Sequence, residues 1–228
     1  MHRAIGYDRA MNVSENRPMI EFDHIVVGAG TLAQGAGYVR EALGVDVPYG
    51  GAHPLMGTHN HLMRLGDAGF LEIIAIDPAA SAARPRWFGL DDPVLRARLA
   101  AKPQIIGWVA RTKDLDRALQ EIPGASGQAI AAARGNLTWR IGVPADGSIA
   151  FGGAFPTLIE WPCGPLPQSR MADRLCSLEG LTITHGEGGV IAAQLAGHLD
   201  DPRINIIAGS PAGLHVILRT PSGLRELQ

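Results

Sequence analysis

Cysteine is scarce in this chain of 228 residues, with Cys163 and Cys176 as the only two. Neither belongs to a Cys-x-x-Cys motif or to the spacing of a zinc site, which excludes the common cysteine-based metal and redox centres. Two reduced thiols in a cytoplasmic protein are the simpler expectation. A single bridge between them stays open as an alternative, because few residues separate the two positions.

Long apolar runs are also missing. No segment approaches the roughly 20 apolar residues that a membrane helix requires, and the N-terminus has no apolar segment of the kind found in signal peptides. Residues 1–18 are polar and unpatterned, which predicts a flexible leader. These features favour a cytoplasmic protein without a membrane partner.

An excess of charge of either sign is absent too. Twenty Lys and Arg stand against 22 Asp and Glu, for a formal net charge of −2, and this balance disfavours a nucleic-acid partner. A dinucleotide-binding fingerprint is not present either. Gly28 and Gly30 follow the first predicted strand, but Ala33 stands where the third glycine belongs.

What the sequence does have is a repeated order of predicted elements, strand-helix-strand-strand-strand. Gly50 to Pro54 is predicted to form a turn or loop within the first module, residues 19–89. Its strands are predicted at 20–27, 45–49, 58–65 and 70–76, and its helix at 32–43 with Gly44 placed to end it.

A second module is predicted over residues 90–167, and it begins with a connecting helix at 90–101 that Asp91 or Asp92 can cap. Its own helix is predicted at 115–122 and its strands at 104–110, 129–133, 137–143 and 156–161. Residues 168–228 look like a partial third unit, with strands at 178–184, 204–208, 214–219 and 224–227 and a helix at 190–199. Tandem modules of this kind usually pair their sheets into one curved surface, so we expect residues 19–228 to form a single structural unit.

Titratable side chains stand inside strands that are otherwise apolar. His24 lies in the first strand of module one, Glu72 in its last strand and Glu160 in the last strand of module two. Such groups are costly to bury without a partner, and matching places in a duplicated module suggest a shared site. Glu72 and Glu160 are therefore candidate catalytic groups. The alternative is a core histidine and two glutamates that pair with arginines.

His24, Glu72 and Glu160 together form a mixed nitrogen and oxygen set that suits Zn, Ni, Mn or Fe(II). A divalent ion there would leave positions for water or a bidentate substrate and would stabilise an enediolate or oxyanion. A polar ligand site without a metal is the competing interpretation of the same residues.

Four further residues are candidates for substrate binding. His53 lies in the predicted loop, where ligand contacts concentrate, and the amide of Asn60 can both donate and accept hydrogen bonds. Trp108 and Trp161 are predicted to be either walls of a cleft or parts of the core.

These motifs resemble the glyoxalase-like domain proteins of the vicinal oxygen chelate superfamily. Residues 22–27, 50–60, 65–74 and 156–161 carry the resemblance. It implies an α+β fold in which tandem βαβββ modules pair into a half-open barrel around a cleft, with metal ligands on the first and last strands of the modules. Trp108 stands at the remaining ligand position, so the four-ligand set of glyoxalase I and the set of two His and one Glu of extradiol dioxygenases are both incomplete.

Two functions follow as hypotheses. The first is a metal-dependent lyase, isomerase or dioxygenase that acts on a small oxygen-rich substrate. The second is a metal-free small-molecule binding protein of the bleomycin-resistance type. A monomer can complete the cleft, because both modules lie in one chain. A homodimer stays open as the alternative for either function.

Overall fold

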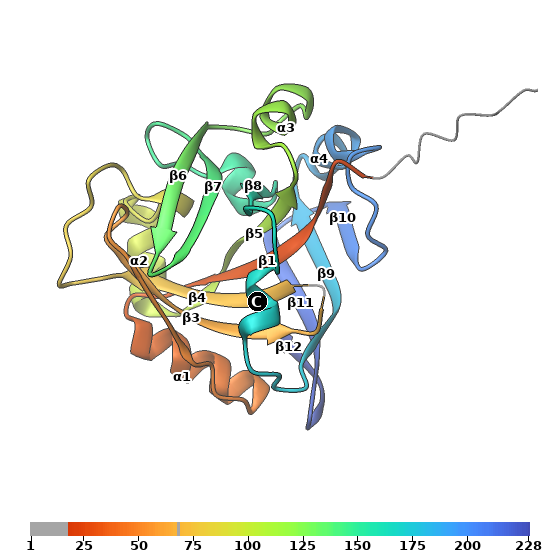
Figure 1. Ribbon diagram of the computed structural model, residues 1–228. Coiled ribbons are helices and arrows are strands. Elements are labelled where there is room, and N and C mark those ends of the chain that lie inside the picture. Colours follow the sequence, from red (N-terminus) through yellow and green to blue (C-terminus); the bar gives the residue numbers. More distant parts are fainter. Residues whose placement is uncertain (1–17, 68) are drawn as a thin grey trace, which may run out of the picture.

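The computed structural model describes residues 18–67 and 69–228, so that all but one residue of the predicted leader lies outside the described residues. The fold is α+β, as predicted, and its larger sheet has eight strands in the order β2-β3-β4-β1-β5-β8-β7-β6 (Figure 1). These strands are β1 (Ile20–Gly28), β2 (Tyr49–His53), β3 (Thr58–Leu65), β4 (Gly69–Ile76), β5 (Gln104–Thr112), β6 (Gln128–Arg134), β7 (Leu137–Val143) and β8 (Thr157–Glu160).

Each predicted module forms half of this sheet. β1 pairs with β4 in parallel, and β5 pairs with β8 in the same way. The halves join through the antiparallel pair of β1 and β5. The edge strands β2 and β6 approach each other, which nearly closes the sheet into the expected barrel.

The helices begin and end where the sequence places caps. Gly44 ends the first helix in the left-handed conformation, and the side chains of Asp92 and Asp114 accept hydrogen bonds from the first turns of the next two. The helices are α1 (Leu32–Leu43), α2 (Pro93–Ala101), α3 (Leu115–Glu121) and α4 (Gly188–Leu195), with short 3₁₀ turns η1 (Trp87–Gly89), η2 (Ala150–Gly153) and η3 (Pro167–Arg170).

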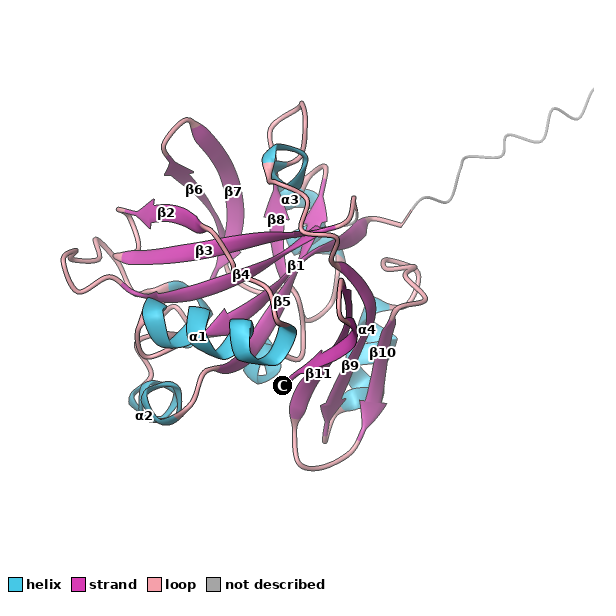
Figure 2. Cartoon of the chain, turned by 90° about the horizontal axis from the view of Figure 1, so that it is seen from below, coloured by secondary structure: helices cyan, strands magenta, loops and turns pink. Residues whose placement is uncertain are grey.

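The C-terminal extension has the predicted order of elements but forms a sheet of its own, against which α4 lies (Figure 2). β9 pairs in parallel with β10 and antiparallel with β11, whereas the first strand of each module pairs in parallel with the last. The extension is therefore like the modules in order but not in pairing. Its strands are β9 (Ser177–His185), β10 (Ile204–Ala208), β11 (Gly213–Thr220) and β12 (Gly223–Leu227).

The loop predicted from Gly50 to Pro54 is a strand for most of its length, and the strand predicted at 45–49 begins only at Tyr49. Glycine is needed in β2 because other side chains cross it closely. A Cβ atom on Gly50 would lie 2.4 Å from Asn60 Oδ1, and one on Gly51 would lie 2.6 Å from Arg134 Cδ. The two glycines thus reflect close approach rather than a turn.

Two hydrophobic clusters divide the strand residues between the faces of the larger sheet. One cluster packs β1, β4 and β5 against α1, α3 and the second sheet, and it contains Trp108. The other contains Val26, Ile74, Trp87 and Trp139 and fills the inside of the barrel. This alternation decides which side chains reach the barrel interior.

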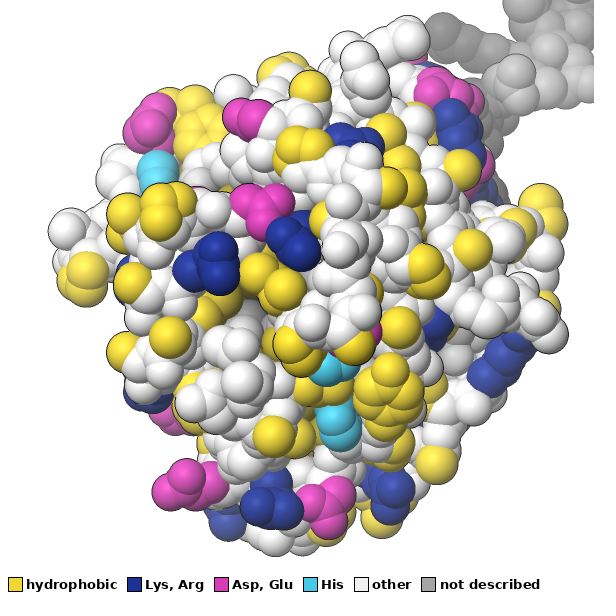
Figure 3. Space-filling model, turned by 90° about the vertical axis from the view of Figure 1, so that its left-hand side faces the viewer, with side chains coloured by type: hydrophobic (Ala, Val, Ile, Leu, Met, Phe, Trp, Pro, Cys, Tyr) yellow, Lys and Arg dark blue, Asp and Glu magenta, His cyan; other side chains and the backbone are white. Residues whose placement is uncertain are grey.

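Several of the simpler sequence predictions can be compared directly with the structure. Cys163 is exposed, Cys176 is buried, and both are free thiols, so the alternative of a bridge is wrong. Among the described residues, no helix is long and apolar enough to cross a membrane. On the face that Figure 3 shows, acidic and basic side chains are interspersed among hydrophobic ones rather than gathered by sign.

Two glycines of α1 give a matched test of how this helix packs. A Cβ on Gly35 would lie 2.4 Å from Ile73 Cγ2, whereas one on Gly37 would meet nothing within 4 Å. We expect Gly35→Ala to lower the free energy of unfolding by about 1–3 kcal/mol through overpacking. Gly37→Ala should raise it by about 0.5–1 kcal/mol through helix propensity. Urea unfolding of both variants checks this, and equal effects would contradict the close contact of α1 with β4.

Candidate functional site

A narrow cleft of about 30 Å³ lies inside the barrel. Its polar side chains come from β1 to β4 and from β6, and its aromatic side chains come from η1, β4, β7 and the end of β8. The residues that line the cleft include His24, His53, Asn60, Phe70, Glu72, Trp87, Arg134, Trp139 and Trp161. Module one therefore supplies the titratable groups other than arginine, and module two supplies most of the opposite wall.

His24 is held between two carboxylates. Its Nδ1 donates to Asp23 Oδ1 over 2.6 Å, and its Nε2 lies 3.5 Å from Glu72 Oε2. The ring stacks on Phe70 with 4.3 Å between the ring centroids. The imidazole is buried and fixed in orientation, while the contact of Nε2 is longer than an ordinary hydrogen bond.

Asp23 reaches the site because β1 has a bulge. Phe22 pairs with Ala110 and His24 with Val109, so that Asp23 has no partner on β5. Asp23 is completely buried, and its second oxygen, Oδ2, accepts a hydrogen bond of 2.9 Å from Trp161 Nε1. Gly69 makes room for the bulge, since a Cβ there would lie 2.0 Å from the Asp23 carbonyl oxygen.

A chain of hydrogen bonds fixes the other side of Glu72. Asn60 Nδ2 donates to Glu72 Oε1 over 2.7 Å and faces His53 Nε2 at 3.3 Å. His53 Nδ1 lies 3.0 Å from Thr58 Oγ1, and an Arg134 nitrogen donates to Asn60 Oδ1 over 3.2 Å. Because the Asn60 amide nitrogen only donates, His53 Nε2 accepts, and the proton of this imidazole stands on Nδ1.

The pKa values describe a buried ion pair beside a neutral histidine. Burial alone would lower the pKa of His24, but hydrogen bonds to Asp23 and Glu72 outweigh it and raise the pKa to about 9. Burial would raise the pKa of Glu72, but His24 and Asn60 lower it to about 2. Burial lowers the pKa of His53 to about 4, which agrees with an imidazole that accepts from Asn60.

Indole rings form much of the rest of the cleft wall. Trp139 lies between Trp87 and Trp161, with ring centroids 6.4 and 5.6 Å away. The indole N–H of Trp161 is bonded to Asp23, whereas the buried N–H of Trp87 has no hydrogen-bond partner among the described residues. The wall thus presents flat apolar surface and one unused donor group.

Five of the seven residues predicted from the sequence meet in this cleft, namely His24, His53, Asn60, Glu72 and Trp161. Trp108 lies elsewhere. It pairs with Ile25, packs in the outer cluster and donates from Nε1 to the carbonyl oxygen of Ala154 over 3.1 Å. A register shift at Ile106 turns Trp108 away from the barrel interior, where Val109 packs instead.

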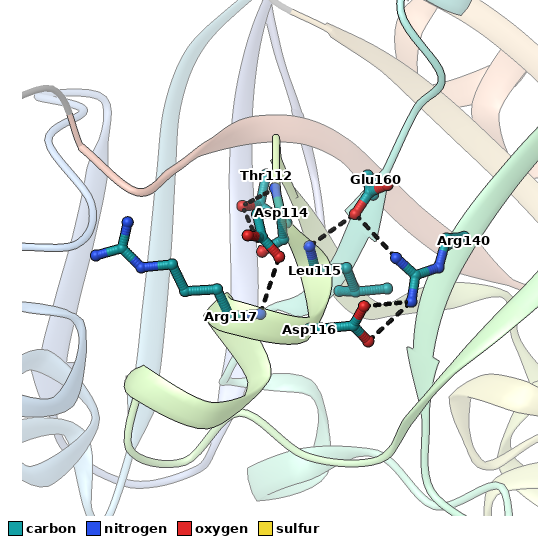
Figure 4. Close-up of polar contacts among 7 residues, drawn as sticks. All are labelled: Thr112, Asp114, Leu115, Asp116, Arg117, Arg140 and Glu160. Carbon is teal, nitrogen blue, oxygen red and sulfur yellow. Dashed lines mark hydrogen bonds and ion pairs between the residues drawn. The ribbon is translucent and has the colours of Figure 1, made fainter.

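Glu160 is also outside the cleft, on the opposite face of β8 from Ile159 and Trp161. Its Oε2 accepts a hydrogen bond of 2.7 Å from the Leu115 N–H and lies 3.4 Å from an Arg140 nitrogen (Figure 4). Arg140 pairs in addition with Asp116. Glu160 therefore holds the start of α3, and the matching strand position did not bring it to His24.

Three residues of the site were not predicted from the sequence: Asp23, Arg134 and Trp139. Asp23 stands next to His24 within an apolar strand, and that was a usable signal, but strict alternation would point it away from its neighbour. Arg134 lies at the end of β6 and reaches the cleft only because the barrel brings β6 beside β2. No local pattern marks that contact.

Comparisons with known proteins agree with this architecture. A model of the glyoxalase-like domain matches residues 22–199. No curated protein sequence matches the chain. A hypothetical protein from Staphylococcus aureus has a similar fold, with a TM-score of 0.58 and 12% identity over 85% of this chain and 88% of that one.

Two enzymes of known structure match with lower TM-scores. A 4-hydroxymandelate synthase mutant from Streptomyces coelicolor has a TM-score of 0.46 and 17% identity, over 92% of this chain and 63% of that one. Methylmalonyl-CoA epimerase from Mycobacterium tuberculosis has a TM-score of 0.37 and 18% identity, over 64% of this chain and 91% of that one. Because the domain model matches residues 22–199, which is well over half of the chain, this chain belongs to the glyoxalase-like domain family.

Proposed function

We propose that this protein is an enzyme that moves a proton on a small oxygen-rich molecule at His24 and Glu72. One observation supports this most directly: an imidazole and a carboxylate face the same cleft, 3.5 Å apart. Each is held in place by a second partner, Asp23 for the imidazole and Asn60 for the carboxylate. Fixed acid and base groups beside a cavity are typical of catalysis by proton transfer.

His24 is suited to the role of the acid. Its Nδ1–H is committed to Asp23, while its Nε2–H is bonded only weakly to Glu72. A substrate oxygen near Nε2 would receive a hydrogen bond from a charged imidazolium that is itself buried. Such a donor stabilises the negative charge that develops on an oxygen when a neighbouring carbon loses a proton.

Glu72 is suited to the role of the base once substrate is bound. In the free protein, the contact with His24 holds the pKa of Glu72 at about 2 and makes it a weak base. A substrate oxygen that takes over the His24 hydrogen bond removes part of that stabilisation. The pKa of Glu72 then rises inside the buried site, and the carboxylate becomes able to accept a proton from the substrate.

A divalent ion is the predicted alternative to direct acid–base chemistry. His24 Nε2 and Glu72 Oε2 would supply two ligands, and an ion there would stabilise an oxyanion. The described residues contain no cluster of three His, Cys, Asp or Glu that could hold an ion, and Glu72 Oε1 is already bonded to Asn60. The donors therefore fall short of a three-ligand set, and the proposed proton transfer does not depend on a metal.

A binding protein is the second candidate, and the indole wall favours it. Trp87, Trp139 and Trp161 offer flat apolar surface to a ring-shaped ligand. This function needs the aromatic wall but needs neither the proton of His24 nor the charge of Glu72. The two candidates can therefore be separated by substitutions that change those two groups.

The first prediction of the proposed function concerns proton exchange. Hydroxyacetone, dihydroxyacetone and pyruvate carry exchangeable C–H groups beside a carbonyl, and ¹H NMR in D₂O measures the exchange. We expect the wild-type protein to accelerate exchange in at least one of them, and Glu72→Gln to lower that acceleration by about 10²-fold or more, because the base is lost. Glu160→Gln is the matched control, since it removes a carboxylate outside the cleft.

Three results would count against the enzyme. If no probe exchanges faster with protein than without it, the binding protein becomes the better account. The same holds if Glu72→Gln and Glu160→Gln exchange equally fast. If Trp139→Ala abolishes ligand binding while Glu72→Gln leaves both binding and exchange unchanged, the indole wall alone carries the function.

The second prediction is a loss of stability at alkaline pH. Because the pKa of His24 is raised from 6.5 to about 9, its contribution is fully present below pH 6.5 and is lost as the pH rises through 9. A change of this size corresponds to about 3 kcal/mol. Urea unfolding at pH 6.5 and pH 9 should show a decrease of this order. Glu72→Gln should reduce the decrease and Glu160→Gln should not; the same pH dependence in all three proteins would contradict the buried ion pair.

The third prediction concerns metal content. Protein purified without chelator and dialysed against Zn²⁺, Ni²⁺, Mn²⁺ and Fe²⁺ should retain less than stoichiometric metal, because His24 must lose a proton before it can bind an ion. Elemental analysis beside a His24→Ala, Glu72→Ala double variant measures this. Stoichiometric metal that disappears in the double variant would establish a metal site and overturn the metal-independent mechanism.

A further inference from the structure

We infer that the molecule recognised by this cleft is a carboxylate, and that Arg134 binds its negative charge. The inference rests on the proposed function insofar as the carboxylate is taken to belong to the substrate. The position of Arg134, its lack of an ionic partner and the shape of the space around it support the inference.

Arg134 is the only Lys or Arg among the described residues that line the cleft. It is half-buried, and the one hydrogen bond it makes is to the neutral oxygen of Asn60. No carboxylate of the described residues lies within salt-bridge distance, although most other half-buried arginines here are paired, as Arg86 is with Asp91. Burial lowers the pKa of Arg134, and the charge of Glu72 only partly opposes this. A guanidinium in this position has an unused fork of donors.

The space beside Arg134 is divided into a small inner part and a large outer part. The inner cleft holds about 30 Å³, and an outer vestibule of about 450 Å³ adjoins it. Four residues line both parts and mark the opening between them: Leu62, Arg134, Leu137 and Pro167. A ligand would therefore place one small functional group in the inner cleft and its larger body in the vestibule.

The inner cleft has more free hydrogen-bond donors than free acceptors. Both oxygens of Asp23 and of Glu72 already accept contacts, and Asn60 Oδ1 accepts from Arg134. Donors remain available on Arg134 and, weakly engaged, on His24. A site with spare donors and occupied acceptors recognises ligands that supply acceptors, and a carboxylate supplies two oxygens in the geometry that a guanidinium matches.

The charges also set the direction of the ligand. Asp23 and Glu72 place two negative charges around His24 at the inner end, which leaves that end net negative. A carboxylate is repelled there and attracted to Arg134 at the opening, where the exposed Arg170 of the vestibule adds a second positive charge. The bound carboxylate would thus lie at the opening beside Arg134, with the larger body of the ligand in the vestibule and only a small group directed inward to His24 and Glu72.

Matched pairs of small molecules test this inference. Benzoate and cinnamate have neutral counterparts of nearly equal shape, benzamide and cinnamamide. We expect the carboxylates to bind the wild-type protein at least about tenfold more tightly, measured by calorimetry and by shifts of the indole N–H signals in NMR. Arg134→Gln should abolish this preference. Arg225→Gln, which removes the same charge from β12 in the second sheet, should leave it unchanged.

The outcomes separate this inference from the proposed function. Equal binding of acids and amides, no binding of either carboxylate at millimolar concentration, or an unchanged preference in a folded Arg134→Gln variant would each overturn the carboxylate site. A preference that depends on Arg134, without any proton exchange that depends on Glu72, would support the site and overturn the enzyme. Proton exchange without a preference would do the reverse.

Discussion

The contact of one buried imidazolium with two buried carboxylates is the interaction on which this site depends. Asp23, His24 and Glu72 are each at most 6% exposed, and burying charge this deeply is costly unless it is paired. The barrel interior tolerates them because each charge has a partner and each carboxylate oxygen accepts a contact. Trp161 comes from module two to bond Asp23, and Asn60 comes from β3 to bond Glu72. The folding of both modules is thus needed to stabilise a charge cluster that lies in one of them.

The two halves of the larger sheet have the same order of elements but supply different kinds of side chain to the cleft. Module one supplies the histidine and carboxylate groups, on strands β1 to β4. Module two supplies Trp139, Trp161 and Arg134, which shape the opposite wall and the opening. On β5 the residue paired with His24 is Val109, which packs in the inner hydrophobic cluster. Module two thus gives the cleft apolar contact and one positive charge, while module one keeps a fixed set of hydrogen bonds.

The sequence predicted those features that depend on near neighbours. The strands, the end of α1 at Gly44, the cap of α2 at one of two neighbouring aspartates, and the convergence of β1 with β4 all follow from local patterns and one parallel pairing. It could not predict the two bulges in the β1–β5 pair, since an extra residue leaves no mark in the alternation. One bulge brings Asp23 into the site, and the other accompanies the turning of Trp108 away from it. The predicted position of Glu160 in the cleft differs from the structure for a related reason. Its strand was identified, but its side chain points to α3.

The orientation of the Asn60 amide is set by the groups around it. An amide can present either its oxygen or its N–H₂ group, and the oxygen would add a ligand for a cation beside Glu72. Arg134 prevents that orientation, because a guanidinium only donates and must be met by Asn60 Oδ1. The N–H₂ group therefore faces Glu72 and His53, where it occupies their acceptors. Asp23 would orient His24 equally well toward a metal or toward a proton acceptor, so the choice between them does not lie in the histidine. The Asn60 oxygen is held by an arginine from the other module, so it is turned away from Glu72 and the amide nitrogen takes its place there.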